Sequence, residues 1–141
     1  MNEPKFDLDS LRERAMKACA NAHAPYSGFF VGAAIWYDGG GVYSACNVEN
    51  ASYGLTLCAE RNAIASAVAV GMRAGELQVV VIYTPGETPV PPCGACRQVM
   101  QEFMRPNAMV YSCCDSEQVL EWSMEQLLPA PFVPEQHSMR P

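Results

Sequence analysis

Three cysteines in two separated stretches of the chain constrain the fold more than any other feature. Cys93 and Cys96 have the C-x-x-C spacing, in which two thiolates reach one metal ion from a single turn. Cys58 lies much earlier in the chain and can supply a third thiolate from another element. Three protein ligands leave the fourth position of a tetrahedral zinc ion open, as in a catalytic site. The fold therefore has to bring these two stretches together.

Glu60 adds a carboxylate to this pattern. It follows Cys58 by two residues, close to the open position without having to be a ligand. A zinc ion with an open position makes hydroxide available near neutral pH, and a neighbouring carboxylate can move the protons. A Cys or His before x-Glu, followed later by P-C-x-x-C, is the pattern of zinc-dependent deaminases. The sequence therefore favours hydrolytic chemistry.

Two other interpretations of the C-x-x-C spacing are a structural zinc half-site and a redox pair. No second C-x-x-C or His pair accompanies it, and no thioredoxin-like signal surrounds it. The open catalytic site is favoured over both.

Three thiolates would leave the zinc site formally negative, which makes a bound water too basic. Both cysteine stretches fall at predicted helix starts, whose partial positive charge offsets part of this and favours thiolates. Arg61 lies one helical turn after Cys58 and is predicted to donate to a ligand sulfur. Arg97, next to Cys96, is a second candidate for this role.

The bulk properties are those of one soluble domain. We expect residues 1–141 to form a single catalytic domain. The net charge is −6 and the nine Lys and Arg residues are scattered, so nucleic acid is not expected as a partner. No apolar run reaches the roughly 18 residues of a membrane span, and the N-terminus lacks the features of a secretory signal. The seven cysteines suit a reducing compartment, so we expect a cytoplasmic protein.

Periodicity and turn signals predict an alternation of helices and strands. The predicted helices are 10–23, 58–70 and 93–104, and the predicted strands are 29–37, 42–48, 77–83 and 107–113. Residues 119–123 fit a fifth strand or a helix, and 125–128 fit a helical turn. Ser10 and Glu13 match the capping-box pattern at the start of the first helix. This order favours an α/β fold with one mixed sheet and helices on its faces.

Polar residues 47, 49 and 50 follow the second predicted strand, just before the Cys58 stretch. Asn47 and Glu49 are therefore well placed to hold a substrate, although a solvated strand end gives the same pattern. Phe29, Tyr53 and Phe132 would, on pattern alone, be core or interface aromatics.

Long motifs resemble one known family. The run N-V-E-N-A-S-Y-G-L-T-L-C-A-E-R at 47–61 and the run P-C-G-A-C-R-Q-V at 92–99 resemble the signature of the cytidine deaminase family. The resemblance extends from the first predicted helix to Phe132. The three-cysteine form and the chain length resemble the homotetrameric branch of that family.

The resemblance implies zinc-dependent hydrolysis of cytidine and 2′-deoxycytidine to uridine and 2′-deoxyuridine, with release of ammonia, as in pyrimidine salvage. One zinc ion per chain would be held by Cys58, Cys93 and Cys96. Hydroxide made available by the zinc would attack C4 of the ring. Glu60 would protonate N3 and then carry a proton to the leaving amine.

The resemblance also implies a substrate site and a fold. Phe29 would lie against the pyrimidine, and Asn47 and Glu49 would bind the ribose, chiefly its 3′-hydroxyl, with Val48 between them. Three further substrate-binding residues would be contributed across the subunit boundaries of a homotetramer: Ala51, Tyr53 and Phe132. The implied fold is a three-layer α/β/α arrangement around a mixed five-stranded sheet.

Three alternatives stay open at this level. A related deaminase could act on a cytosine-containing antibiotic such as blasticidin S, although the pair Asn47 and Glu49 favours a nucleoside. A deaminase that edits polynucleotides is disfavoured by the acidic charge. A zinc-stabilised binding protein without catalysis is disfavoured by Glu60, because a structural site needs no carboxylate there.

Overall fold

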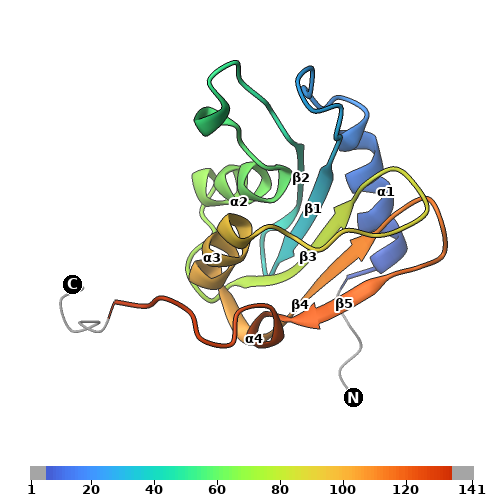
Figure 1. The fold of residues 1–141 in the computed structure, drawn as a ribbon. Helices are drawn as coiled ribbons and strands as arrows, with labels where there is room; N and C mark the ends of the chain where they lie inside the picture. Colours follow the sequence, from blue (N-terminus) through green and yellow to red (C-terminus); the bar gives the residue numbers. More distant parts are fainter. Residues whose placement is uncertain (1–5, 135–141) are drawn as a thin grey trace.

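Five strands form one sheet at the centre of the computed structural model, which describes residues 6–134 (Figure 1). The sheet order is β2-β1-β3-β4-β5. β3 and β4 pair in parallel, whereas the other neighbouring pairs are antiparallel, so the sheet is mixed. The strands are β1 (Gly32–Tyr37), β2 (Gly41–Cys46), β3 (Leu77–Tyr83), β4 (Met104–Cys113) and β5 (Leu120–Ser123).

Helices cover both faces of this sheet (Figure 1). One face is covered by α1 (Leu8–Cys19), and the other by α2 (Ala59–Ala69), α3 (Gly94–Phe103) and the short α4 (Met124–Leu127). A 3₁₀ turn, η1 (Tyr53–Leu55), precedes α2. The expected α/β fold, with three layers around a mixed five-stranded sheet, is confirmed. Within residues 6–134, no helix has both the length and the apolar character needed to span a bilayer.

β3 lies in the middle of the sheet and is apolar on both faces. Val79 and Val81 pack on the α1 side, whereas Val80 and Ile82 pack on the side of α2 and α3. All four are almost completely buried. Burial on both faces is why the sequence of this strand is a continuous apolar run rather than an alternating one.

The start of α1 differs from the prediction. Asp7 is the N-cap residue and its side chain makes no capping hydrogen bond, while Ser10 lies inside the helix. The capping-box interpretation of Ser10 and Glu13 is therefore wrong.

Backbone pairing between distant segments shortens several predicted elements. Val48 forms bridges with His23 on one side and Leu57 on the other. The His23 N–H donates to the Asn47 carbonyl at 3.0 Å, so the chain has left α1 before residue 23. β2 correspondingly ends at Cys46, and the residues after it run between two other segments. Periodicity along one segment carries no signal for such pairing.

Gly32 opens β1 where α1 crosses the sheet. A Cβ atom at this position would lie 1.9 Å from the Ala15 carbonyl oxygen and 2.9 Å from the Cβ of Cys19. The nearest atom belongs to the helix backbone and cannot rotate away. Glycine is therefore required for α1 to pack this closely on β1.

Hydrogen bonds connect the loop between β4 and β5 to the end of β3 and to the loop between β3 and α3. The Asp115 N–H donates to the Gly86 carbonyl at 2.8 Å, and Asp115 Oδ2 accepts from the Gly86 N–H at 2.7 Å. The Tyr83 hydroxyl donates to Asp115 Oδ1, and the Ser116 hydroxyl donates to the Glu87 carbonyl at 2.8 Å. Because the held loop leads directly into α3, these bonds also fix the approach to that helix.

We expect Gly32→Ala to lower the free energy of unfolding by about 3 kcal/mol, at the upper end of what overpacking usually costs. The added methyl group would overlap the Ala15 carbonyl. Urea unfolding followed by circular dichroism measures the change. Gly54→Ala is the matched control, because nothing lies within 4 Å of a Cβ there. Wild-type stability in Gly32→Ala would contradict the close packing of α1 on β1.

Candidate active site

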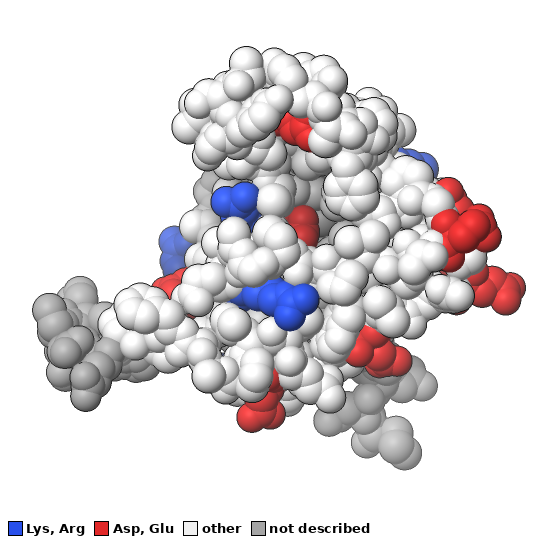
Figure 2. All heavy atoms as spheres, in the orientation of Figure 1, with Lys and Arg blue, Asp and Glu red and all other residues white. Residues whose placement is uncertain are grey.

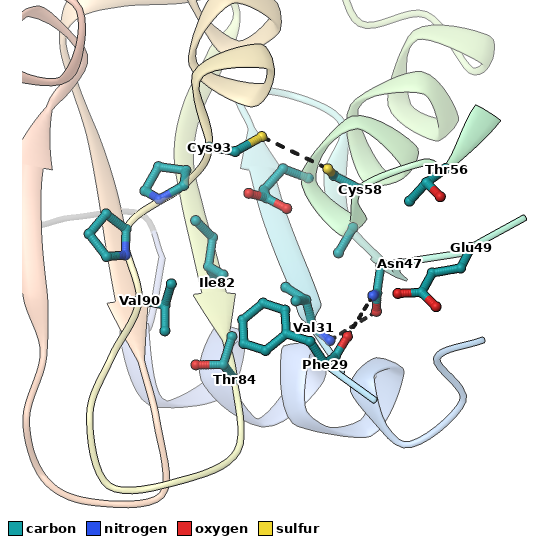
Figure 3. A pocket seen from close by; sticks show the side chains of 14 residues that line it. Phe29, Val31, Asn47, Glu49, Thr56, Cys58, Ile82, Thr84, Val90 and Cys93 are labelled. Atoms are coloured by element: carbon teal, nitrogen blue, oxygen red, sulfur yellow. Dashed lines mark hydrogen bonds between the residues drawn. The ribbon is translucent and has the colours of Figure 1, made fainter. Parts of the chain in front are cut away.

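Two helix N-termini bring the three cysteine side chains together. Cys58 and Cys93 are the N-cap residues of α2 and α3, and Cys96 lies in the first turn of α3. The three sulfur atoms lie within 4.8 Å of one another. The Sγ–Sγ distances are 3.9 Å for Cys58 and Cys93, which face each other in Figure 3, and 3.5 Å for Cys93 and Cys96. The predicted convergence of the two stretches is present.

The surroundings of the sulfur atoms favour a thiolate at Cys58. A hydrogen bond with the Cys96 thiol and the nearby Arg61 guanidinium lower the pKa of Cys58 to about 5. The same bond with Cys58, together with burial, raises the pKa of Cys96. The partial positive charge of a helix N-terminus also favours a thiolate at a capping position.

The two candidate arginines differ in what they contact. Arg61 Nη2 donates to Cys58 Sγ at 3.2 Å, as the spacing predicts. Arg97 instead donates to two backbone carbonyls, from Nε to Pro92 at 2.9 Å and from Nη1 to Leu127 at 3.1 Å. The prediction that Arg97 serves a sulfur is therefore wrong. Its bonds join the start of α3 to the end of α4.

The three sulfur atoms fit a zinc ion. Soft thiolate ligands select zinc over the hard cations that prefer oxygen. The helix N-termini already hold the three donors close together, so little rearrangement is needed to bind one ion. Three protein ligands leave one position for a water or a substrate.

Glu60 lies in the first turn of α2 and is only 4% exposed. It lines the same cavity as Cys58 and Cys93. Burial raises the pKa of Glu60, because the surrounding groups replace only part of the water that would solvate a charge. A buried carboxyl group with a raised pKa can act as an acid as well as a base, which suits general acid–base catalysis.

A cavity of about 280 Å³ contains these groups (Figure 3). Its apolar walls come from the segment before β1, from β3 and from the loop after β3: Phe29, Val31, Ile82, Val90, Pro91 and Pro92. Polar side chains also line it: Asn47, Glu49, Thr56, Glu60 and Thr84. Apolar walls with a few convergent polar groups suit a small planar molecule that carries hydrogen-bonding groups.

Asn47 joins two segments of the cavity wall. Its Oδ1 accepts from the Val31 N–H at 2.9 Å, and its Nδ2 donates to the Phe29 carbonyl at 2.9 Å. An amide side chain has two acceptor sites and two donor protons, so one of each remains. Asn47 therefore positions the wall and keeps hydrogen-bonding capacity for a ligand.

Glu49 is held from the side of residues 26–27. Its Oε1 accepts from the Tyr26 N–H at 3.0 Å and from the Ser27 N–H at 3.2 Å. Its Oε2 accepts from the Ser27 hydroxyl. The hydroxyl bond and the backbone donors lower the pKa of Glu49, so this carboxylate is ionised at neutral pH.

Four predicted substrate-binding residues do not line this cavity: Val48, Ala51, Tyr53 and Phe132. Tyr53 lines a smaller hollow that shares Glu49 and Thr56 with the cavity, and its ring packs edge-on against Tyr26 at 5.8 Å. The side chains of Tyr53 and Phe132 are 74% and 77% exposed. One chain therefore leaves the aromatic surface of Tyr53 uncovered in the adjoining hollow, and that of Phe132 uncovered outside both hollows.

The cavity is also lined by Thr84 and by the loop residues Val90 and Pro91, to which no sequence motif pointed. The Thr84 hydroxyl is buried and has no partner among the residues that the structure describes. Thr84 directly follows the buried strand 77–83, and residues at the carboxyl end of such a strand are candidates for a site. That signal was available in the sequence.

Comparison with known proteins places these features in one family. Residues 7–113 match the family described as cytidine and deoxycytidylate deaminase zinc-binding region. A cytidine deaminase of Sporosarcina psychrophila is 42% identical over 127 residues, which cover 90% of this chain and 92% of that protein. A cytidine deaminase of Halalkalibacterium halodurans is 41% identical over 92% of this chain and 97% of its own length.

A solved structure shows the same arrangement of the chain. The crystal structure of cytidine deaminase from Burkholderia pseudomallei has a TM-score of 0.85 and 45% sequence identity, over 90% of this chain and all of that one. The matched family region and the three converging sulfur atoms both indicate zinc as the metal.

We expect Cys93→Ser to lose bound zinc, because a serine hydroxyl does not ionise to a strong zinc ligand near neutral pH. Metal analysis of the purified protein, as zinc per folded chain, measures the loss. Cys113→Ser is the matched control, since Cys113 is buried on the α1 face, away from the three sulfur atoms. Full zinc content in a folded Cys93→Ser protein would exclude Cys93 as a ligand.

Proposed function

The chain belongs to the cytidine and deoxycytidylate deaminase family, and from this membership we propose that it hydrolyses cytidine and 2′-deoxycytidine to uridine and 2′-deoxyuridine, with release of ammonia. The relatives named above are cytidine deaminases at about this chain's own length. The observation that carries the proposal is the buried Glu60 beside three converging thiols, in a cavity with apolar walls.

We propose that Glu60 moves the protons of the reaction. It would give a proton to N3 of the pyrimidine and later deliver one to the leaving amine at C4. Burial raises the pKa of Glu60, which favours its protonated form more than in an exposed carboxyl group. Cys58, Cys93 and Cys96 would hold the zinc ion, which would make hydroxide available at neutral pH.

We propose that Arg61 reduces the negative charge of the thiolates and does not contact the substrate. It donates to Cys58 Sγ and so removes part of the negative charge that three thiolates place on the metal.

The remaining polar and aromatic groups are proposed to orient the nucleoside. Phe29 would lie against the pyrimidine ring, which it can reach from the cavity wall. Asn47 and Glu49 would bind the ribose, with Val48 between them. Because Glu49 is ionised and already oriented, it can accept from a sugar hydroxyl without further ordering.

A nucleoside fits this cavity better than a nucleotide. Among the residues that the structure describes, those lining the cavity and the adjoining hollow include no Lys, Arg or His. Glu49 would repel a phosphate, and no cation there would offset the repulsion. We therefore favour cytidine over deoxycytidylate, which the family name also covers. On the face in Figure 2, Lys and Arg side chains are scattered and form no stripe that would hold a polynucleotide.

We propose that the chain works as a homotetramer with shared sites. Exposed apolar side chains support this proposal, because Tyr53, Leu55 and Phe132 would be covered in such an assembly. Ala51, Tyr53 and Phe132 would then complete the site of a neighbouring subunit.

We further propose that residues 1–141 make up one catalytic domain and that the protein is cytoplasmic. The sheet that carries the cavity draws on residues 32–123, which supports a single domain. All seven cysteines are free, which suits a reducing compartment.

Purified, zinc-loaded protein should lower the ultraviolet absorbance of the cytosine band when given cytidine. Glu60→Ala should lose at least about 10²–10⁴ of this rate while keeping its zinc, because a general acid–base group is removed. Cytidine 5′-monophosphate, as the matched substrate, should be turned over far more slowly. A zinc-loaded wild-type tetramer without activity on cytidine would overturn the proposed function, and equal turnover of the monophosphate would overturn the preference for nucleosides.

Shared sites predict recovery of activity when two inactive variants are mixed. Glu60→Ala and Phe132→Ala proteins are unfolded together and refolded as a mixture. Some sites then combine an intact Glu60 with an intact Phe132 from a neighbour, so activity should exceed the sum of the separately refolded variants. Light scattering measures the assembly. Simple additivity, or a fully active monomer, would contradict shared sites.

A further inference from the structure

The Glu49 carboxylate is held in a way that leaves one defined acceptor site. An ionised carboxylate has about four lone-pair positions on its two oxygens. Oε1 accepts from two N–H groups, those of Tyr26 and Ser27, at 3.0 and 3.2 Å. Oε2 accepts only from the Ser27 hydroxyl among the described residues. The remaining capacity therefore lies on Oε2, in a direction that the Ser27 hydroxyl limits.

The Ser27 hydroxyl also contacts the aromatic wall of the cavity. Its oxygen accepts from the Phe29 N–H at 3.0 Å while its proton goes to Glu49. Gly28 lies between these residues with φ +68°, a left-handed conformation that lets the backbone turn tightly enough for this bond. One hydroxyl thus joins Glu49 to the residue that carries the Phe29 ring, and both side chains line the cavity.

We propose that Ser27 is a positioning residue that aims Oε2 of Glu49 at a hydroxyl of the substrate's sugar and fixes its distance from the Phe29 wall. This inference rests on the proposed function. Ser27 itself does not line the cavity; it lines the adjoining hollow, behind Glu49. It therefore acts through Glu49 and Phe29 rather than by touching the ring that reacts.

The proposal predicts a loss that depends on the sugar. Without the Ser27 hydroxyl, Glu49 keeps its backbone donors on Oε1 but can rotate about them, so Oε2 is no longer aimed. A substrate that donates a sugar hydroxyl to Oε2 loses a charge-assisted hydrogen bond. A substrate that lacks this hydroxyl has no such bond to lose.

The experiment compares cytidine with 2′,3′-dideoxycytidine, in the zinc-loaded wild type and in Ser27→Ala. We expect KM for cytidine to rise about tenfold in Ser27→Ala with little change in kcat, as for loss of one hydrogen bond to a charged group. For 2′,3′-dideoxycytidine we expect both constants to stay within about twofold of the wild type. Ser27→Thr keeps the hydroxyl and should restore most of the affinity for cytidine.

Ser116→Ala is the matched control. The Ser116 hydroxyl also donates to one group and accepts from the backbone N–H two residues later, at Gln118, but it holds the loop between β3 and α3. Any effect of Ser116→Ala should be the same for both substrates. An equal effect of Ser27→Ala on both substrates, or failure of Ser27→Thr to restore affinity, would overturn the positioning role. Absence of activity in the wild type would instead overturn the proposed function.

Discussion

The meeting of two helix N-termini at three thiols is the constraint on which the rest of this structure depends. α2 follows β2 and α3 follows β3, and their first residues approach closely because both helices pack on the same face of one sheet. The converging N–H groups and partial charges favour anionic sulfur there. Cys58 and Cys93 sit at the two capping positions, where a serine or threonine would be usual in a purely structural helix.

Two carboxyl groups in the same cavity have opposite environments. Glu60 is buried near the thiols, and burial raises its pKa. Glu49 is half-buried and receives three hydrogen bonds from residues 26 and 27, which lower its pKa. One is suited to carrying a proton and the other to accepting a hydrogen bond as a fixed charge. A pair of acids separated in this way can support two tasks within one small site.

The parts predictable from the sequence were those with a local signal. The apolar run of β3 predicted its bounds, and the spacing of the cysteines predicted their convergence, as well as the contact of Arg61 with Cys58. The end of α1 and the bonds of Asn47 and Ser27 were not predictable, because they depend on pairing between segments distant in the chain. The roles of Tyr53 and Phe132 stay predictions, since their exposed rings do not line the cavity of a single chain.

The parallel pairing of β3 with β4 links formation of the metal site to assembly of the whole sheet. Parallel neighbouring strands need a crossover connection, which here contains α3. This crossover carries two of the three sulfur atoms, those of Cys93 and Cys96. The third, that of Cys58, belongs to the preceding crossover through α2. No local hairpin or single helix holds the complete set. The complete set of three sulfur atoms is therefore brought together only when non-local contacts have formed. A metal ion that binds only the folded chain adds its binding free energy to the stability of the whole sheet. Removing the ion with a chelator therefore destabilises the whole molecule rather than one loop.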